Sequence, residues 1–295
     1  METKLTESMH CPDALCEWSL DGSPIKCLSE SLKSLVPGVG LVTHEGGIYL
    51  RKRNGGGTVY VCVQLHAENI DQFYCKATTM IGMNWNILNM KVFKSMSGKQ
   101  SNMTYFVQDT DRDVSETFSI MINNDSGRTN LYSIFPTDDE SDDMVIQDDY
   151  EYTCIMHTNT FQSIIKDIGV MVDGKASGSR VKITGLQDSI KFAITGIDGN
   201  LQILLSPKTD NDLEIHCEKD DFRVFENEYP IEILSEVCKS ANIKMTENVQ
   251  ISLPIKGPDS PPLLIQMNVG SYGEVKYYIS EKACAEELAC VDDQE

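Results

Sequence analysis

The stretch YTCIMHTNTFQSIIKDIGVMV, residues 152–172, shows the pattern that decides the fold. Its first six residues include aromatic and β-branched side chains and are typical of a strand. After them, apolar residues recur at helical spacing, at Phe161, Ile164, Ile165 and Ile168. Lys166 lies outside that apolar stripe. The stretch therefore predicts a strand that leads directly into an amphipathic helix.

The same unit occurs four times along the chain. Helices are predicted at residues 23–35, 85–96, 160–172 and 230–243, and runs typical of short strands follow each of them. In the first helix, Ser23 is the expected N-cap and Pro24 the first helical residue. Two units precede and two follow an acidic stretch near residue 140. This internal repetition predicts an α+β fold of two similar domains, each with two helices on an antiparallel sheet.

Lysines lie away from the apolar stripe in all four predicted helices, at Lys26, Lys33, Lys91, Lys94, Lys166 and Lys239. A single lysine on a helix is usually only solvated. Its repetition in every unit favours a shared electrostatic role, and both interpretations stay open on the pattern alone.

The composition is that of an acidic globular protein with a formal net charge of −20 over 295 residues. Such a charge opposes nucleic-acid binding unless the lysines gather on one surface. No apolar run is long enough for a membrane helix, and the N-terminus has no secretory pattern.

The ten cysteines indicate a reducing compartment and free thiols. A zinc site formed by His10, Cys11 and Cys16 is the alternative, although the spacing does not match a zinc knuckle. We expect no cofactor and no metal.

Residues 136–151 interrupt the repeated pattern. Eight of these sixteen residues are acidic, and they surround one apolar island, Met144-Val145-Ile146. An acidic run is typical of a solvated linker, which leaves the island unexplained.

Several segments resemble the family of proliferating cell nuclear antigen. EYTCIMHTNTFQSIIKDIG, SIKFAITGIDGN and GEVKYYISEK are similar to its second domain, and SPIKCLSESLKSLV and AENIDQFYC to its first. Their order is preserved from about Gly22 to Lys282. The resemblance implies a DNA sliding clamp: a head-to-tail trimeric ring, with helices lining its hole, that encircles duplex DNA, tethers polymerase as a processivity factor and catalyses nothing.

The resemblance also implies a division of the chain. We expect an N-terminal extension at 1–20, clamp domain one at 21–134, an acidic interdomain connecting loop at 135–152, clamp domain two at 153–282 and an acidic tail at 283–295. By the same resemblance, subunits would meet through the strand TNLYSIF (129–135) and the strand around Lys182–Leu186.

Two sites follow from the resemblance. The six lysines on the helices would face DNA. A pocket for a short aromatic-bearing motif of client proteins would be formed by Tyr60, Met144, Val145, Ile146, Pro262, Tyr278 and Ile279. The implied partners are duplex DNA, polymerase and other clients, a clamp loader and further copies of the chain, with no membrane. The implied location is the nucleus, or a viral replication compartment if the source is a virus.

The chain departs from the family at informative positions. Glu232 replaces a basic residue on the last helix, Gln187 falls at the lysine used for ubiquitin conjugation, and Ser280-Glu281 replace a small residue and a proline. These departures favour a divergent clamp with its own client preferences, from a protist or a large DNA virus.

Three other functions are weighed against the clamp. One is a subunit of a checkpoint-type heterotrimeric clamp, and another is an acidic β-rich interaction protein without DNA binding. The third is an enzyme, but Cys154 and His157 would point to opposite faces of their strand, and no nucleophile, base and orienting group can be proposed together.

Overall fold

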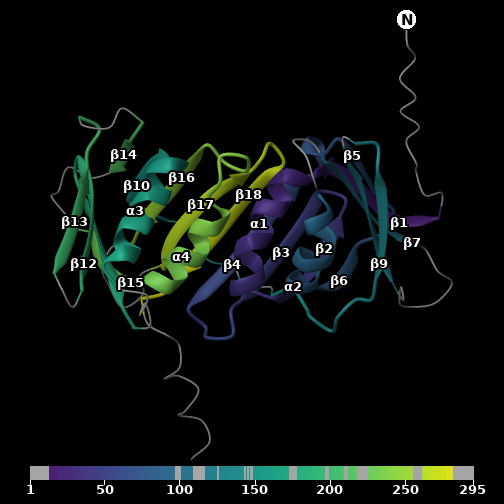
Figure 1. Cartoon of the computed structure of the whole chain (residues 1–295), viewed down its shortest axis with the longest axis horizontal. Helices are drawn as coiled ribbons and strands as arrows, with labels where there is room; N and C mark the ends of the chain where they lie inside the picture. The colour runs from purple at the N-terminus through teal and green to yellow at the C-terminus, as the bar shows by residue number, and fades with distance from the viewer. Residues whose placement is uncertain are drawn as a thin grey trace, which may run out of the picture.

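The computed structural model describes residues 13–281, apart from the segments 97–100, 109–116, 125, 143, 145, 147–148, 173–177, 197–198, 209–211, 218–224 and 255–260. Within this part of the chain, three sheets stand side by side along the long axis of the molecule (Figure 1). Their strand pairings are antiparallel, and the helices lie on one face of the sheets. The α+β class predicted from the sequence is therefore confirmed.

In its described residues, the first half of the chain contains one regular helix, one irregular helical segment and a short 3-10 turn. Its elements are β1 (Ala14–Asp21), α1 (Gly22–Leu35), β2 (Gly38–His44), β3 (Gly47–Arg53), β4 (Val59–His66), η1 (Ala67–Asn69), β5 (Gln72–Cys75), β6 (Thr79–Asn84), α2 (Trp85–Ile87), η2 (Leu88–Val92), η3 (Phe93–Ser95), β7 (Ser101–Gln108), β8 (Phe118–Asn124) and β9 (Thr129–Ile134).

The second half repeats this succession of strands around two regular helices. Its elements are β10 (Tyr152–His157), α3 (Thr158–Val170), β11 (Arg180–Leu186), β12 (Ser189–Thr195), β13 (Asn200–Leu205), β14 (Glu214–Cys217), β15 (Phe225–Pro230), α4 (Ile231–Ser240), β16 (Asn248–Leu253), β17 (Leu263–Val269) and β18 (Gly273–Ile279).

A nine-stranded sheet in the order β14-β10-β16-β17-β18-β4-β3-β2-β6 joins the two halves through the pairing of β18 with β4. A five-stranded sheet, β5-β1-β7-β8-β9, flanks it at one end, and a four-stranded sheet, β13-β12-β11-β15, at the other. Strands β9 and β13 are therefore edge strands at opposite ends of the molecule (Figure 1).

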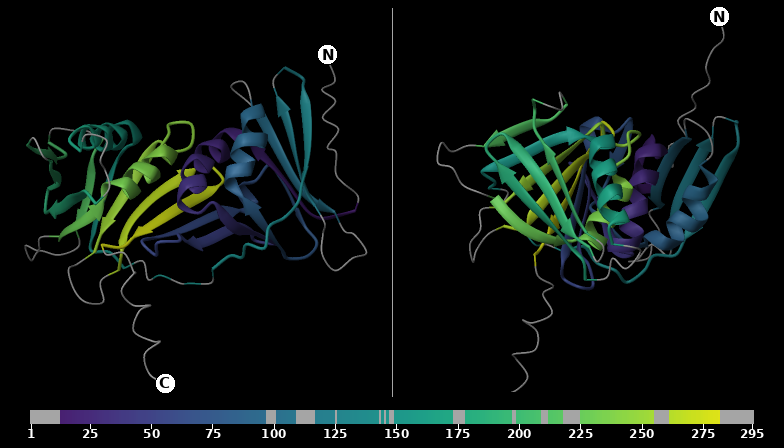
Figure 2. Two further views of the ribbon diagram at one scale, coloured as in Figure 1. Left: turned by 60° about the horizontal axis from the view of Figure 1, so that its bottom comes forward. Right: turned by 60° about the vertical axis from the view of Figure 1, so that its left-hand side comes forward.

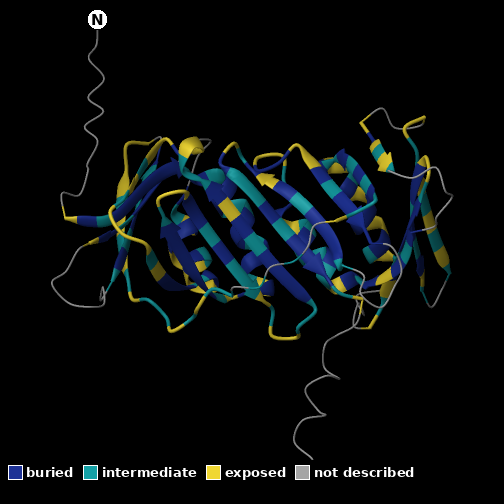
Figure 3. Ribbon diagram, turned by 180° about the vertical axis from the view of Figure 1, so that it is seen from behind, coloured by how far each residue is buried: buried dark blue, intermediate teal, exposed yellow. Residues whose placement is uncertain are grey.

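The two faces of this array differ in what covers them. We call the face covered by α1, the α2–η3 segment, α3 and α4 the helix face, and the opposite one the outer face (Figures 1 and 2). Seen from behind, the outer face shows bare strands, crossed by the segment that connects β9 to β10 (Figure 3).

The apolar stripes predicted for the helices are buried as expected. Leu28 and Leu32 of α1, Ile164 and Ile168 of α3 and Leu234 of α4 are all at most 3% exposed. Helix α1 begins earlier than predicted, however, because Asp21 is its N-cap and accepts a hydrogen bond from the Ser23 amide. An ionised carboxylate is a strong N-cap acceptor, so it takes the place assigned to Ser23.

Helices α1 and α4 are linked across β18 by buried hydroxyl groups. The hydroxyl of Tyr277 lies 2.6 Å from Ser31 Oγ on α1 and donates to Ser240 Oγ on α4 at 3.0 Å. Burial raises the pKa of Tyr277 to about 12. The neutral hydroxyl is thus the form that the folded chain favours.

We expect Tyr277→Phe to lower the free energy of unfolding by about 1–2 kcal/mol, because it removes hydrogen bonds between buried groups. A raised pKa stabilises the fold below pH 10, and this contribution is lost as the pH rises toward 12. The variant should therefore lose less stability than the parent between these two values in urea titrations. An equal loss in both proteins would contradict the role given to Tyr277.

The expected N-terminal extension is too long. Residues 14–20 form most of β1, a strand between β5 and β7 in which Cys16, Trp18 and Leu20 are at most 4% exposed. Apolar side chains at every second position give one buried strand face, and that alternation was the signal overlooked. Residues 1–12 lie outside the described residues.

One of the two expected subunit edges is also wrong. The strand around Lys182–Leu186 is β11, which is paired on both sides, with β12 and β15. The free edge of that sheet nearest in sequence is β13, whose residues alternate between exposed and half-buried. Apolar content alone does not distinguish a central strand from an edge strand, because both bury one face. Strand β9 is an edge strand, as expected.

No helix among the described residues combines the length and the apolar character needed to span a bilayer.

Candidate nucleic-acid interface and peptide pocket

The six lysines singled out from the sequence all belong to helical segments of the helix face. Lys26 and Lys33 are on α1, Lys91 on η2, Lys94 on η3, Lys166 on α3 and Lys239 on α4. Lys91, Lys94, Lys166 and Lys239 are exposed, and the two lysines of α1 are half-exposed. The fold thus gathers onto one face cations that lie far apart in the sequence.

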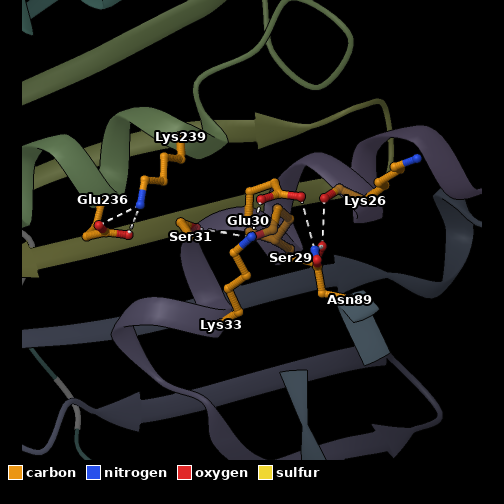
Figure 4. A network of polar contacts seen from close by, with 9 residues as sticks. Lys26, Ser29, Glu30, Ser31, Lys33, Asn89, Glu236 and Lys239 are labelled. Atoms are coloured by element: carbon orange, nitrogen blue, oxygen red, sulfur yellow. Dashed lines mark hydrogen bonds and ion pairs between the residues drawn. The ribbon is translucent and has the colours of Figure 1, made fainter. Parts of the chain in front are cut away.

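Two of these lysines form ion pairs with a glutamate of their own helix (Figure 4). Lys33 Nζ lies 2.5 Å from Glu30 Oε2, and Lys239 Nζ lies 2.6 Å from Glu236 Oε1. Both pairs have the three-residue spacing that places side chains on one side of a helix. Their positive charge is partly neutralised before any ligand arrives.

Glu30 is also held from a second helical segment. The Asn89 side-chain amide of η2 donates to Glu30 Oε1 at 3.0 Å and to Ser29 Oγ at 2.9 Å (Figure 4). Burial would raise the pKa of the Glu30 carboxyl, but the hydrogen bonds from Lys33 and Asn89 outweigh it and lower that pKa. Glu30 is therefore ionised at neutral pH.

The remaining lysines have no carboxylate partner among the described residues. Lys26 Nζ donates to the backbone carbonyl of Met96 at 3.1 Å. Lys91, Lys94 and Lys166 take part in no ion pair within the described chain. These four side chains are the cations most available to an anionic ligand.

The charge of the helix face is uneven between the two halves. Helix α1 has two lysines and one glutamate, and the α2–η3 segment has two lysines and no acid. Helix α3 has one lysine and one aspartate, and α4 has one lysine and two glutamates, Glu232 and Glu236. The positive charge is concentrated on the helical segments of the first half.

The acidic connecting segment crosses the outer face in a slot, by which we mean the space left above Gly40 and Gly82. Gly40 of β2 and Gly82 of β6 are cross-strand partners. A Cβ at Gly82 would collide with the carbonyl oxygen of Thr137, and one at Gly40 would lie 2.7 Å from the Ser141 amide nitrogen. The absence of side chains at both positions lets the segment lie directly on the sheet.

Beyond the slot, backbone groups attach the segment to β3. The Asp142 amide donates to the Arg51 carbonyl at 2.7 Å, and the Arg53 amide donates to Asp142 Oδ2 at 2.7 Å. The Ser141 hydroxyl accepts from the Arg51 amide at 3.2 Å. The segment is therefore fixed to the body of the molecule before its apolar island begins.

The apolar island packs on three side chains of the outer face. Tyr60, Leu264 and Tyr278 lie on neighbouring strands β4, β17 and β18 and form a buried cluster. Met144 and Ile146 pack against this cluster, together with Tyr150. Between the cluster and the segment is a pocket of about 160 Å³, lined by Arg51, Tyr60, Cys62, Gln64, Met144, Ile146, Glu274, Lys276 and Tyr278.

The pocket differs from the expected one in two members. Ile279 is 0% exposed and belongs to the main core, because neighbouring residues of a strand point to opposite faces and Tyr278 faces the pocket. Pro262 does not line the pocket but accepts a hydrogen bond from Tyr150 through its carbonyl. Val145 lies outside the described residues.

Sequence reasoning missed the polar half of the pocket. Cys62 lies two residues after Tyr60 on β4, and Lys276 lies two residues before Tyr278 on β18. The two are cross-strand partners. Arg51 is the partner of Cys62 on β3. A period of two applied outward from Tyr60 and Tyr278 could have found Cys62 and Lys276, whereas Arg51 depends on the pairing of β3 with β4.

Tyr60 also fixes the island by a hydrogen bond. Its hydroxyl donates to the Met144 carbonyl at 2.9 Å. We expect Tyr60→Phe to raise amide hydrogen exchange at Met144 and Ile146 about fivefold, the effect of losing one hydrogen bond of about 1 kcal/mol. Tyr49→Phe, on the neighbouring strand and outside the pocket lining, is the matched control. Equal exchange in both variants would mean that packing alone holds the segment.

Other chemistry weighed from the sequence finds structural explanations. Burial raises the pKa of the Cys16 thiol on β1. Its Sγ atom lies 3.3 Å from Thr79 Oγ1 on β6. His10 and Cys11 lie outside the described residues. His157 caps α3 by accepting from the Asn159 amide, while Cys154 is buried. Among the described residues, no three His, Cys, Asp or Glu side chains gather as a metal site would require.

Known proteins resemble both halves of this architecture. Residues 17–152 match the family model of the proliferating cell nuclear antigen N-terminal domain. The chain is 24% identical over 269 residues to a probable DNA polymerase sliding clamp of Paramecium bursaria Chlorella virus 1, covering 89% of this chain and 94% of the relative.

Two further relatives extend the similarity to cellular proteins. The proliferating cell nuclear antigen of Dictyostelium discoideum is 19% identical over 264 residues, covering 89% of this chain and 97% of the relative. The crystal structure of the antigen from Entamoeba histolytica superposes with a TM-score of 0.76 at 18% identity, covering 91% of this chain and 99% of that one. The chain described here is a divergent chain similar to proliferating cell nuclear antigen over most of its length, and residues 17–152 match the model of that family's N-terminal domain.

Proposed function

We propose that the chain is a sliding clamp, which assembles head to tail into a three-subunit ring, encircles duplex DNA and tethers DNA polymerase. The observation that carries the proposal is the arrangement of α1, the α2–η3 segment, α3 and α4, with their six lysines, on one face of an array that has the edge strands β9 and β13 at opposite ends. Closing such units edge to edge would turn the helix face into the lining of a hole. The viral relative, named a probable DNA polymerase sliding clamp, supports the same function.

The electrostatics fit a ligand that must slide. Lysine side chains contact phosphates as flexible point charges and read no base sequence. The acidic remainder of a chain with a net charge of −20 repels DNA from other surfaces. Duplex DNA inside the ring would thus be held by topology and contacted only through weak, salt-sensitive interactions. The proposal includes no catalytic step.

Within the ring, we assign most of the DNA contact to the first half of each subunit. The α1 and α2–η3 segments contain four lysines and one acid, whereas α3 and α4 contain two lysines and three acids. Lys33 and Lys239 share their charge with Glu30 and Glu236. Most phosphate contacts would then be made by the first-half helices of the three subunits.

The outer-face pocket is the proposed docking site for client proteins, including polymerase. It combines the apolar cluster of Tyr60, Leu264 and Tyr278 with a segment that covers it. A client side chain that replaces Met144 or Ile146 on this cluster would bury comparable apolar surface. A clamp loader would open the ring, and the place of action would be the nucleus or a viral replication compartment.

The decisive experiment is retention on DNA of defined topology. The purified clamp and a clamp loader are incubated with nicked circular plasmid, and the complex is isolated by gel filtration. We expect the clamp to remain on the circle and to be lost once a restriction enzyme linearises the plasmid. Equal retention on circular and linear DNA would contradict encirclement, and a ring with other chains would identify a heterotrimeric clamp.

A further inference from the structure

The polar half of the outer-face pocket has a surplus positive charge. Lys276 Nζ lies 3.5 Å from Glu274 Oε1, and Glu274 Oε2 also accepts a hydrogen bond from Gln266 at 2.6 Å. The charges of Lys276 and Glu274 therefore largely offset each other. Arg51, the third charged residue of the lining, has no carboxylate partner within the described chain.

The surroundings of Arg51 leave its guanidinium incompletely satisfied. Its Nε atom is buried and lacks a hydrogen-bond partner among the described residues. The guanidinium carbon lies 5.0 Å from the centre of the Tyr49 ring, which orients the group but accepts no N–H hydrogen bond in its plane. Buried donors without partners destabilise a fold, and the Cys62 thiol is the side-chain hydrogen-bond partner of this guanidinium, so an acceptor bound in the pocket would complete its hydrogen bonding.

Two described acids of the connecting segment, Asp139 and Asp142, accept hydrogen bonds from groups other than Arg51. Asp142 Oδ2 accepts the Arg53 amide, and Asp139 Oδ2 accepts the Thr137 hydroxyl. The segment meets Arg51 through backbone groups and the Ser141 hydroxyl. An acidic segment thus passes next to an arginine of the pocket without forming an ion pair with it in the described chain.

We infer that this pocket selects client peptides with a carboxylate next to their apolar anchor, and that Arg51 is the residue that recognises it. This inference rests on the proposed client site and names the chemistry of its partner. A carboxylate would accept two N–H groups from one guanidinium, the geometry that arginine favours. Lys276, beside Glu274, would add a weaker attraction.

The spacing of the pocket restricts where the carboxylate lies. The apolar cluster includes Tyr60, and Arg51 is level with Cys62, two residues further along β4. Two strand residues span about 7 Å. The acid and the apolar anchor of a client are thus expected on adjacent turns of a helical segment or two residues apart in an extended one.

The test uses short fluorescein-labelled peptides with one leucine and two aromatic anchors. A single glutamate is moved along the positions around the leucine, and each peptide is paired with one that has glutamine there. We expect glutamate to bind about five- to tenfold more tightly than glutamine at one or two positions by fluorescence anisotropy. Arg51→Gln should abolish this preference, and Arg51→Lys should retain part of it.

Lys52→Gln is the matched control, because Lys52 is the next residue of β3, has the same charge and lies outside the pocket lining. It should leave the preference unchanged. A preference that survives in Arg51→Gln, or that Lys52→Gln abolishes equally, would overturn the inference. So would the absence of any preference at every position. Thermal unfolding of the three variants shows that each is folded when its binding is measured.

Two further measurements separate the alternatives. In Arg51→Glu, a lysine at the selected peptide position should bind more tightly than a glutamate, which a merely structural role of Arg51 would not produce. Deleting residues 283–295 should leave the preference for glutamate intact. If both peptides bind more tightly after the deletion, the acidic tail of the chain itself occupies the pocket, and the inference of a separate client is overturned. Retention on circular DNA, measured on the same variants, tests encirclement independently of peptide binding.

Discussion

The variant with Leu131→Asp and Leu204→Asp is expected to be a monomer. Leu131 on β9 and Leu204 on β13 are 61% and 60% exposed, although both are large aliphatic residues on free sheet edges. Edge strands with exposed apolar side chains are typical surfaces for pairing with another chain. Two aspartates at each junction would replace apolar contact with repulsion between like charges, in addition to lost burial.

Light scattering after gel filtration measures this directly. The parent should have three times the 33.0 kDa mass of the chain, and the variant should have that mass alone. Burying a leucine contributes about 2 kcal/mol at each site. The subunits of the variant should therefore associate at least about a hundredfold more weakly than those of the parent. Ile243→Asp, at another exposed aliphatic residue away from both edges, is the control. A trimeric double variant would exclude β9 and β13 as the junction.

The helices and their buried stripes could be predicted from the sequence because a helix shows its periodicity locally. Phe161, Ile164 and Ile168 identify the core side of α3 without knowledge of its neighbours. Strand order has no comparable signal. Strands β11 and β13 are similarly apolar, and only the return of β15 to pair with β11 makes one central and the other an edge.

The candidate pocket shows the same division between local and tertiary information. The aromatic residues Tyr60 and Tyr278 stand out in the sequence, and the resemblance placed them near a client site. Arg51 does not stand out, because an arginine on a half-exposed strand is ordinary. Its interest comes from what the described part of the fold places around it: a buried Nε without a hydrogen-bond partner, the ring of Tyr49 beneath the guanidinium, and a Glu274 carboxylate that pairs with Lys276 instead.

On the helix face, the fold added information about pairing that composition could not supply. Six lysines were expected to act alike, but Lys33 and Lys239 are paired with glutamates, and Lys26 donates to a backbone carbonyl. Exposed ion pairs are weak, so such lysines keep some attraction for phosphate. Lys91 and Lys94, which form no ion pair within the described chain, keep all of it. Substitution of Lys91 and Lys94 should therefore weaken DNA binding more than substitution of the other lysines.

Lys91→Glu with Lys94→Glu should lower the affinity for a short linear duplex, from whose ends the ring can dissociate, by about ten- to a hundredfold near physiological salt and leave the trimer intact. Both lysines are exposed on the α2–η3 segment, which contains no acid, so each substitution replaces attraction with repulsion. Each lost phosphate contact lowers the slope of log affinity against log salt by about 0.9. Measuring the affinity for the linear duplex from low to high salt therefore counts the contacts that these residues make.

The matched variant is Lys33→Gln with Lys239→Gln, which removes two lysines from the same face that are already paired with Glu30 and Glu236. Its loss of duplex affinity should be several times smaller. Because each glutamine substitution changes the charge by less than a glutamate substitution does, Lys91→Gln with Lys94→Gln completes the comparison at equal charge. If the two glutamine pairs weaken the affinity for the linear duplex equally, ion pairing on the helices does not set the DNA contact. If only the Lys91 and Lys94 pair matters, the duplex is held mainly against the first-half helices. The ring's attraction for DNA then depends on where its acids leave lysines unpaired rather than on how many lysines it has.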